Sequence, residues 1–571
     1  MTFQRMSLSF GLKVTACLVW ALSLQAATLE VLWVKKGEEP SFLSQFGVLN
    51  ENAPPTLRLP QNTVNHAKNT LRFVQGRVDD NQISHVRYDQ YFLGVPVWGA
   101  QLIYHLGNNS ITLTGQVIAH IEEDIKTLDT KLSAEDAKQI AFSKIPGNKE
   151  PVIKKIVYLK SKSSKAVLAY LISYWAETQE GRSFPHFIIN ANTGKTLRFW
   201  NGHEKAEIGQ GQGGVTFSNL SYRPGRYQFG TYFAGLNALG KLNVVYRTGT
   251  CTINNPLFQV VSLENQAQPN LPFTLPISYA NAQKYQLLPF SYACSSPNYL
   301  NLNDGGFAPV NDGLSPINDV TYFIQQTFDM YRVQYGSSAP IGSNLPIRVY
   351  VHLDDFDNAE ACSTSCMRES GVAGPQQLTF GNGSSENAPY SDIGTSGHEF
   401  AHLVTGYFSN LIYENQSGGI NESFSDMGEF ALKSYLRKRY PWIWNGKDWT
   451  IGLDISKIKK ASRYMNNPPL DGHSIGNAAN FVRGMDVHYS SGVFNKAFYL
   501  LSTTPGWTVE KAFRIMFDAN MHYWIPASTF DYAACGVIQA AYNRGYPHQD
   551  VINAFSRVGV TCLVGEAPLM A

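Results

Sequence analysis

The chain has 571 residues, a formal net charge of +2 and 44% hydrophobic residues, values typical of a globular protein with two to four domains. Its 46 basic and 44 acidic residues include no basic block interleaved with aromatic side chains, so nucleic acid is not expected as a partner.

The N-terminus has the layout of a secretory signal peptide. Arg5 and Lys13 precede an apolar run over residues 14–24, and two alanines follow. A membrane anchor is the weaker alternative, because the run is too short to cross a bilayer of about 30 Å and no other stretch is long and apolar enough. We therefore expect residues 1–26 to be a signal peptide and the rest of the chain to be secreted into the extracellular space.

Residues 27–205 are predicted to form two small α+β modules. Ser133 can cap a helix that has acidic residues in its first turn and an apolar face. A Gly/Gln-rich stretch at residues 209–214 is typical of a flexible linker that proteases can reach. The predicted strands cover residues 93–106, 111–121, 166–175 and 185–200, the last interrupted by a turn at residues 192–194.

The remaining residues are predicted to form two lobes with a cleft between them. Strands and turns predominate from Val215 to about Leu300, and one more strand is expected over residues 346–353. Helical patterns begin at Ile317 and predominate after Asp392. A β-rich half followed by a helical half predicts an α+β fold. We place the β-rich lobe at residues 206–396 and the helical lobe at residues 397–571.

The cysteines suggest disulfides in the second part of the chain. Of seven cysteines, Cys17 lies within the signal peptide and the other six follow residue 250. An even number in an exported chain suggests three disulfides, although the sequence alone leaves 15 pairings open. The six are Cys251, Cys294, Cys362, Cys366, Cys535 and Cys562.

A metal site is indicated by the segment from His398 to His402, His-Glu-Phe-Ala-His. On a helix the two histidines lie on the same face, so both imidazoles can reach one ion, and Glu399 would lie beside it where a water would bind. Five residues alone are also found in helices whose histidines are ordinary surface residues. The residues that follow strengthen the metal interpretation.

Glu422, twenty residues after His402, can be a third ligand, because catalytic zinc takes three protein ligands and keeps one position open. Asp426, one helical turn later, can accept the spare N–H of one histidine, and Asn421 that of the other. The alternative is that Glu422 and Asp426 are exposed acids that repel each other mildly. Two acids at that spacing are better explained beside a cation.

These motifs resemble those of the thermolysin-like peptidases, and most closely the pseudolysin (bacterial elastase) branch. The similarity covers roughly residues 206–564. In the first part of the chain, the residues from Arg87 to Tyr91 and from Gly94 to Ala100 resemble the fungalysin/thermolysin propeptide motif. The matching segments are the helix with both histidines and residues 418–426, 485–495 and 534–538, with residues 185–200 resembling the end of a second propeptide module.

The resemblance implies a secreted zinc endopeptidase that acts on proteins or peptides and is made as a proenzyme. Its propeptide would serve as inhibitor and folding aid, and we expect a monomer without a membrane anchor. Processing is expected near Ala206. Two alternatives remain. One is another zinc hydrolase such as an aminopeptidase, although no motif that would grip a substrate amino group is found. The other is a catalytically narrowed paralogue that acts as a binding or adhesion protein.

The resemblance also implies catalytic roles. Glu399 would be the general base that takes the proton of the attacking water and passes it to the leaving amine. Tyr413 and His488 would stabilise the oxyanion. Asp486 would orient the ring of His488 and keep it cationic. All of these residues are present, which favours an enzyme over a binding protein.

Substrate contacts and disulfide pairs follow from the same resemblance. Arg463 would bind a substrate carbonyl, and Asn358 and Ala359 would hold the substrate backbone by β-type pairing. The implied disulfides are Cys251–Cys294 and Cys535–Cys562, which leaves Cys362 to pair with Cys366 in the loop at the substrate edge, an addition unusual in the family.

Two further departures from the family concern calcium and the primary pocket. Carboxylates of the family's calcium cluster are replaced here by Gly394, Phe430 and Lys433. A hard cation wants several anionic oxygens, so we expect this calcium site to be absent or very weak. Pocket positions are occupied by Thr395 and Ser462, and Glu-Ala-Cys replaces the usual aromatic pair after Ala359, which favours a more polar pocket.

Overall fold

The computed structural model describes residues 26–562, with several gaps. The signal peptide, the stretch at residues 209–214, the processing region near Ala206 and Cys294 lie outside the described residues. Among the residues described, no helix is long and apolar enough to cross a membrane. The gaps are residues 36–37, 52, 55–56, 59–66, 108–110, 148–149, 162–163, 179–180, 203–226, 229–230, 233–243, 268–270, 272–274, 294–315, 343–344, 355 and 442.

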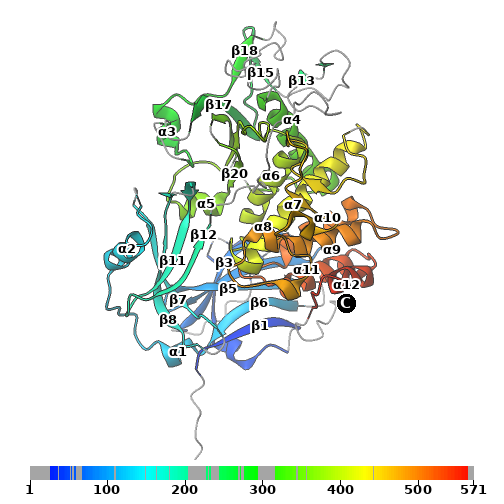
Figure 1. Ribbon diagram of the computed structural model, residues 1–571. Coiled ribbons are helices and arrows are strands. Elements are labelled where there is room, and N and C mark those ends of the chain that lie inside the picture. Colours follow the sequence, from blue (N-terminus) through cyan, green and yellow to red (C-terminus); the bar gives the residue numbers. More distant parts are fainter. Residues whose placement is uncertain are drawn as a thin grey trace, which may run out of the picture.

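The first part of the chain forms one ten-stranded sheet, blue to cyan in Figure 1. The strand order is β12-β11-β8-β7-β5-β4-β3-β2, with β6 pairing to both β5 and β1. The two predicted modules meet where β5 and β7 run parallel at Val97 and Val157. The strands are β1 (Thr28–Lys35), β2 (Gly47–Leu49), β3 (Asn69–Val78), β4 (Ser84–Phe92), β5 (Val95–Leu106), β6 (Ile111–Ala119), β7 (Val152–Tyr158), β8 (Val167–Ser173), β11 (Pro185–Asn190) and β12 (Thr196–Asn201).

Local sequence explains where these elements begin and end. Ser133 and Asp136 form a capping box at the start of α2 (Ala134–Phe142). The strand predicted from residue 93 begins only at Val95, because Leu93 and Gly94 adopt the positive φ angles of a tight turn. The next strand ends at Ala119, because His120 also has a positive φ and α1 (Ile121–Asp124) follows.

The β-rich lobe contains a four-stranded sheet in the order β17-β19-β21-β20. Its strands are β17 (Phe258–Ala267), β19 (Ile347–Asp354), β20 (Ala359–Cys362) and β21 (Gln377–Gly381). Strand β20 pairs only with β21 in this sheet and is therefore an edge strand. A smaller sheet contains β15 (Val245–Arg247), β16 (Thr250–Thr252) and β18 (Ser291–Ala293), and the helices of this lobe are α3 (Tyr279–Lys284), α4 (Pro316–Asp329) and α5 (Thr364–Glu369).

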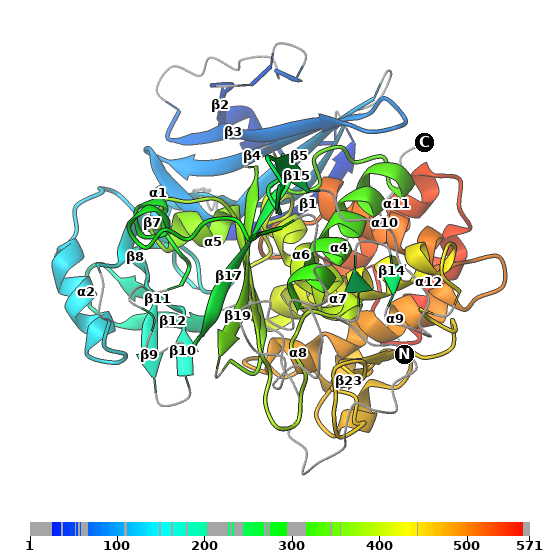
Figure 2. The same ribbon diagram turned by 90° about the horizontal axis from the view of Figure 1, so that it is seen from above.

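The helical lobe forms the yellow-to-red side of the molecule in Figures 1 and 2. Helix α6 crosses the predicted border between the lobes at residues 396 and 397. The α+β class predicted from the sequence is thereby confirmed. The helices are α6 (Ile393–Tyr407), α7 (Asn415–Arg437), α8 (Val487–Ser490), α9 (Gly492–Ser502), α10 (Val509–His522), α11 (Phe530–Asn543) and α12 (His548–Ser556), with the short strands β22 (Thr450–Ile451) and β23 (Arg463–Tyr464).

Disulfides close two of these regions. Cys362 pairs with Cys366 and joins β20 to α5, and Cys535 pairs with Cys562 and joins α11 to the segment after α12. Cys251 is also disulfide-bonded, and its expected partner lies outside the described residues.

Helices α6 and α7 cross with their backbones in close approach. A Cβ atom at Gly397 would lie 3.1 Å from the carbonyl oxygen of Gly428, and one at Gly428 would lie 3.0 Å from the carbonyl oxygen of Gly397. Glycine lets the two helices approach this closely, because a side chain at either position would press on the backbone of the other helix. This crossing brings side chains on α6 and α7 within reach of one centre.

Candidate metal centre

His398 and His402 on α6 and Glu422 on α7 converge on a single point. The Nε2 atoms of the two histidines are 3.1 Å apart. Glu422 Oε2 lies 3.5 Å from His398 Nε2, and Glu422 Oε1 lies 3.4 Å from His402 Nε2. All three side chains are buried, and among the described residues theirs is the group whose geometry could hold a metal ion.

Hydrogen bonds fix both rings so that Nε2 is free to bind a metal. His398 Nδ1 lies 3.0 Å from Asp426 Oδ1, and His402 Nδ1 lies 2.9 Å from Asn421 Oδ1. Both partners are oxygen acceptors, so each Nδ1 carries its proton and donates it. These are the two contacts that the sequence indicated for Asp426 and Asn421.

The donor set fits zinc. Ligands bound at about 2.0–2.2 Å in a tetrahedron lie about 3.3 Å apart, close to the observed spacing. Glu422 Oε2 is buried without a hydrogen-bond partner, which a bound cation would supply. Two imidazoles, one carboxylate and an open fourth side are the ligand set of catalytic zinc.

Burial and charge set the protonation of the ligands before zinc binds. Burial lowers the pKa of His402 to about 4, so this ring is neutral. Burial also disfavours the cationic form of His398, but its hydrogen bond with Asp426 and the nearby negative charge of Glu422 outweigh that effect and raise its pKa to about 10. Zinc must therefore displace a proton from His398, and acid weakens its binding.

Glu399 follows the ligand His398 on α6. Its side chain is fully buried, and neither carboxylate oxygen has a hydrogen-bond partner in the described structure. Burial raises its pKa to about 8 in the absence of a metal, and the positive charge of a bound cation favours the ionised form.

Tyr413 and His488 approach the same centre from the opposite side. The hydroxyl of Tyr413 donates to Glu422 Oε1 and lies 3.5 Å from His488 Nε2. Asp486 caps α8 and accepts from His488 Nδ1 at 2.8 Å. Burial opposes a charged His488, but Glu422 and Asp486 outweigh it and raise its pKa to about 9.

The alkaline side of the pH profile is expected to depend on this pair. Asp486→Asn removes a carboxylate that favours the imidazolium, so the pKa of His488 falls by about one unit. The upper limb of kcat/KM against pH should move down by the same amount. The control is Asp531→Asn, outside the cleft, which should leave the limb in place. An unmoved limb in Asp486→Asn would show that His488 is not the group that titrates there.

Asp426 is held by more partners than the sequence indicated. Arg463 Nε and Nη2 donate to it at 3.1 and 2.5 Å. Asn495 on α9 donates to Oδ2 at 2.7 Å and accepts from Ser423 Oγ at 2.7 Å. This role of Asn495 was not predicted from the sequence pattern. The sequence does carry one indication of it: Asn495 follows apolar residues at the start of α9, and a polar side chain that is buried there needs a hydrogen-bond partner.

Zinc affinity is expected to depend on Asn495. Asn495→Ala leaves Asp426 Oδ2 with fewer donors, so the carboxylate holds His398 less rigidly and zinc affinity should fall about tenfold. Titration against a competing chelator measures it. The exposed Asn553 on α12 offers the control, since Asn553→Ala should bind zinc like the wild type. Equal affinities for the two variants would contradict the role of Asn495.

The predicted substrate contacts lie around the centre. Ala359 begins the edge strand β20, and Asn358 precedes it, with its carbonyl accepting from Gly381 at 3.0 Å. Arg463 begins β23, where its guanidinium contacts Asp426. Thr395 lies in the first turn of α6, and Ser462 bonds to the carbonyl of Ile451.

The positions implied for calcium surround a buried lysine. Lys433 Nζ lies 2.7 Å from Glu429 Oε1 and 2.8 Å from Asp454 Oδ2. The carboxylate of Glu429 packs directly against Gly394, where an added Cβ would lie 2.8 Å from it. Asp392, the N-cap of the zinc helix α6, is electrostatically coupled to the same group. An ammonium ion thus neutralises carboxylates at the start of α6.

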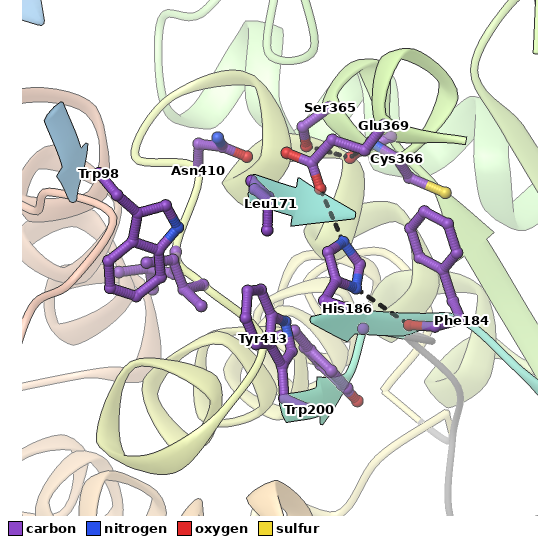
Figure 3. A pocket seen from close by; sticks show the side chains of 14 residues that line it. Trp98, Leu171, Phe184, His186, Trp200, Ser365, Cys366, Glu369, Asn410 and Tyr413 are labelled. Carbon is purple, nitrogen blue, oxygen red and sulfur yellow. Dashed lines mark hydrogen bonds and ion pairs between the residues drawn. The ribbon is translucent and has the colours of Figure 1, made fainter. Parts of the chain in front are cut away.

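A pocket separates the first part of the chain from the loop that contains Tyr413 (Figure 3). Trp98, His186 and Trp200 line it from the ten-stranded sheet, and Glu369 and Tyr413 line it from the other side. His186 Nε2 lies 3.2 Å from Glu369 Oε2 across the pocket. Arg198 nearby forms an ion pair with Glu414, the residue that precedes α7. The first part of the chain therefore contacts the segments next to the metal centre.

Comparison with known families matches four parts of the chain. Residues 229–406 match the thermolysin metallopeptidase catalytic domain, and residues 409–560 match its alpha-helical domain. Residues 69–118 match the fungalysin/thermolysin propeptide motif, and residues 131–200 match the peptidase propeptide and YPEB domain.

Curated relatives are similar over most of their length. The hemagglutinin/proteinase of Vibrio cholerae is 33% identical over 512 residues, covering 88% of this chain and 74% of the relative. The neutral protease of Vibrio proteolyticus is 34% identical over 496 residues, covering 85% and 72%. The zinc metalloproteinase MspA of Legionella longbeachae is 31% identical over 519 residues, covering 86% and 89%.

Proposed function

Because the chain belongs to the thermolysin family of metallopeptidases, and is a zinc endopeptidase made with a propeptide, we propose the following division of labour in it. Residues 1–26 direct secretion into the extracellular space, residues 27–205 inhibit the peptidase and aid its folding, and residues 206–396 and 397–571 form the lobes. The contacts of His186 and Arg198 beside Tyr413 support the inhibitory role. The substrates are proteins or peptides of the surroundings, and the active form is a monomer.

The observation that carries the function is the convergence of His398, His402 and Glu422 beside the unpartnered carboxylate of Glu399. Zinc in such a site polarises a water and the carbonyl that it attacks. We assign Glu399 the transfer of the proton from that water to the leaving amine. The hydroxyl of Tyr413 and the cationic ring of His488 would donate to the oxygen on which charge develops.

The substrate would lie along the edge strand. The free side of β20 offers backbone groups to an extended peptide, and Asn358 and Ala359 stand at its start. Arg463 would add a donor for a substrate carbonyl. Thr395, Ser462 and the polar residues after Ala359 support a pocket more polar than is usual in the family. Cleavage of a peptide library tests this, and a strong preference for bulky apolar residues would contradict it.

The finer placement beside the pseudolysin branch is also a proposal. It is supported by the sequence motifs at residues 485–495 and 534–538 and by the Cys535–Cys562 disulfide, which is the pairing that this resemblance implied.

Cleavage of casein by the secreted product is the direct test of the function. Activity should be lost with phenanthroline and restored by zinc. A peptide with a blocked amino terminus should also be cleaved, which an aminopeptidase would leave intact. If processed protein with bound zinc cleaves nothing, the endopeptidase is excluded and the binding or adhesion protein becomes the better explanation.

A further inference from the structure

The first propeptide module docks on the end of helix α10, far along the chain from the metal ligands. Strands β4 and β5 place Arg87, His85 and His105 against this end, where His522 is the last residue of the helix. Aromatic stacking continues the contact: the rings of Trp33 and His105 stack on Tyr523 with centroids 5.9 and 4.9 Å away. Figures 1 and 2 both show the blue strands beside the orange and red helices.

Arg87 supplies the donors that the helix end lacks. Its guanidinium donates to the carbonyl oxygens of Trp524 at 2.6 Å, Met521 at 3.0 Å and Asn520 at 3.4 Å. The last carbonyls of a helix have no partner within it and carry partial negative charge, so a cation there is favourable. Arg87 is only 2% exposed and belongs to the propeptide motif identified from the sequence.

Three histidines lie beside this contact with too few acceptors for three protonated rings. His85 Nδ1 and His105 Nδ1 are 2.6 Å apart, a distance that accommodates one proton between them and not two. His85 Nε2 faces Asp79 Oδ2 at 3.1 Å, and His105 Nε2 faces Thr114 Oγ1 at 2.7 Å. His522 stacks on His85 with centroids 4.1 Å apart, and its buried Nδ1 has no hydrogen-bond partner in the described structure.

The charged residues around the three histidines do not offer a free carboxylate that could balance the charge of a further protonated ring. Acids facing it are Asp79, already paired with His85, and Asp518, already paired with Arg544. Cations facing it are Arg87 and Arg77 from the propeptide, and Arg514 and Arg544 act on Asp518 from the peptidase side. Protonating His105 or His522 would therefore place a new cation among arginines.

We propose that the end of α10 is an acid-sensitive docking site for the first propeptide module, which Arg87 anchors at neutral pH and the three histidines release on acidification. The proposal rests on the proposed function, since release matters only if the propeptide inhibits the peptidase. The proposed docking site would control inhibition by the propeptide from outside the catalytic cleft.

The direction of the pH dependence follows from the pKa values of the three histidines in the complex and in the separated parts. Burial lowers the pKa of His85, and lowers those of His105 and His522 well below the ordinary value. In the separated parts these rings regain a pKa near 6.5. The complex is therefore fully stable above about pH 6.5 and loses affinity as the pH falls below it, by up to about tenfold per pH unit for each ring.

The test uses the full chain with Glu399→Gln, so that no peptidase activity enters, and with a site for an added specific protease within residues 209–214. After cutting, the peptidase part is immobilised and the dissociation rate of the propeptide is measured at pH 7.5 and 5.5. The wild-type interface should dissociate at least about tenfold faster at pH 5.5. His105→Gln with His522→Gln should remove most of that difference, and the surface variant His548→Gln should keep it.

Equal dissociation rates at the two pH values would overturn the proposal, as would a full pH difference in the double variant. If the propeptide of the double variant does not bind the peptidase part at pH 7.5, the same measurement is made on His522→Gln alone. This variant should still bind, because His522 Nδ1 has no hydrogen bond to lose. Casein cleavage by the wild type tests the proposed function separately, so either can fail without the other.

Discussion

Glu399→Gln is expected to lower casein hydrolysis by about two to four orders of magnitude while zinc stays bound. Glutamine keeps the size of the side chain but cannot accept the proton of the attacking water. The zinc ligands are unchanged, and their hydrogen bonds to Asp426 and Asn421 do not involve Glu399. Casein hydrolysis and zinc content should be measured on the same preparation.

The matched control is Glu510→Gln, a partly exposed glutamate on α10 that pairs with Lys438. It should hydrolyse casein at the wild-type rate. If Glu399→Gln kept more than about a tenth of the activity with zinc bound, another group would have to take the proton, and the role of Glu399 would be wrong.

Lys433→Met is expected to destabilise the protein by about 3–5 kcal/mol, because removing one partner of a buried ion pair leaves an uncompensated charge. Glu429 and Asp392 are each about 2% exposed, so water cannot replace the ammonium. Chemical denaturation of the Glu399→Gln chain, in which self-digestion is suppressed, measures the loss. Lys438→Met near the end of the same helix is the control, since its exposed ion pair is worth at most about 1 kcal/mol.

The stability lost in Lys433→Met should increase as the pH rises from 5 to 8. Burial raises the pKa of Glu429 to about 7, with Lys433 opposing that shift and Asp392 adding to it. Without the lysine the folded state favours the protonated acid even more. A carboxyl group whose pKa is higher in the folded than in the unfolded state does not destabilise the protein at low pH, where it is protonated in both states. It lowers the stability as the pH rises and the group ionises. A defect that is the same at both pH values would contradict this assignment.

The same lysine bears on calcium. The ammonium already neutralises the carboxylates at the start of α6, so removing calcium with a chelator should leave the unfolding temperature of the wild type unchanged. A marked decrease on calcium removal would refute the predicted absence or weakness of this calcium site.

The metal ligands could be predicted from the sequence because their pattern is local. The spacing of His398 and His402 follows from helix geometry, and Glu422 with Asp426 lies on one face of the next long helix. Helix and strand positions were similarly accessible from periodicity. The predicted elements differ from the structure mainly at ends such as Leu93 and His120, where residues adopt positive φ angles, whereas strands β1, β3, β4 and β7 were not predicted.

Contacts between residues far apart in the chain could not be predicted. Asn495 lies 69 residues from Asp426, and Arg87 lies 437 residues from Trp524. The family resemblance implied that Lys433 stands where a calcium-binding carboxylate is usual, but not that its ammonium group would pair with Asp454. No periodicity encodes such partners, because they depend on how the lobes and the propeptide pack.

The close crossing at Gly397 and Gly428 has a consequence for how this enzyme can diversify. Backbone atoms of the facing helix, together with the Cβ atom of Ala401, set the separation of α6 and α7 at that point. Substitutions on β20 and β23, the segments proposed to bind substrate, are therefore expected to leave the position of His398 relative to Glu422 unchanged. A methyl group at either glycine would require the facing atoms to shift by a few tenths of an ångström. The spacing of the metal ligands is thus fixed by a contact that lies apart from the proposed substrate-binding segments, and that contact disfavours larger residues at Gly397 and Gly428.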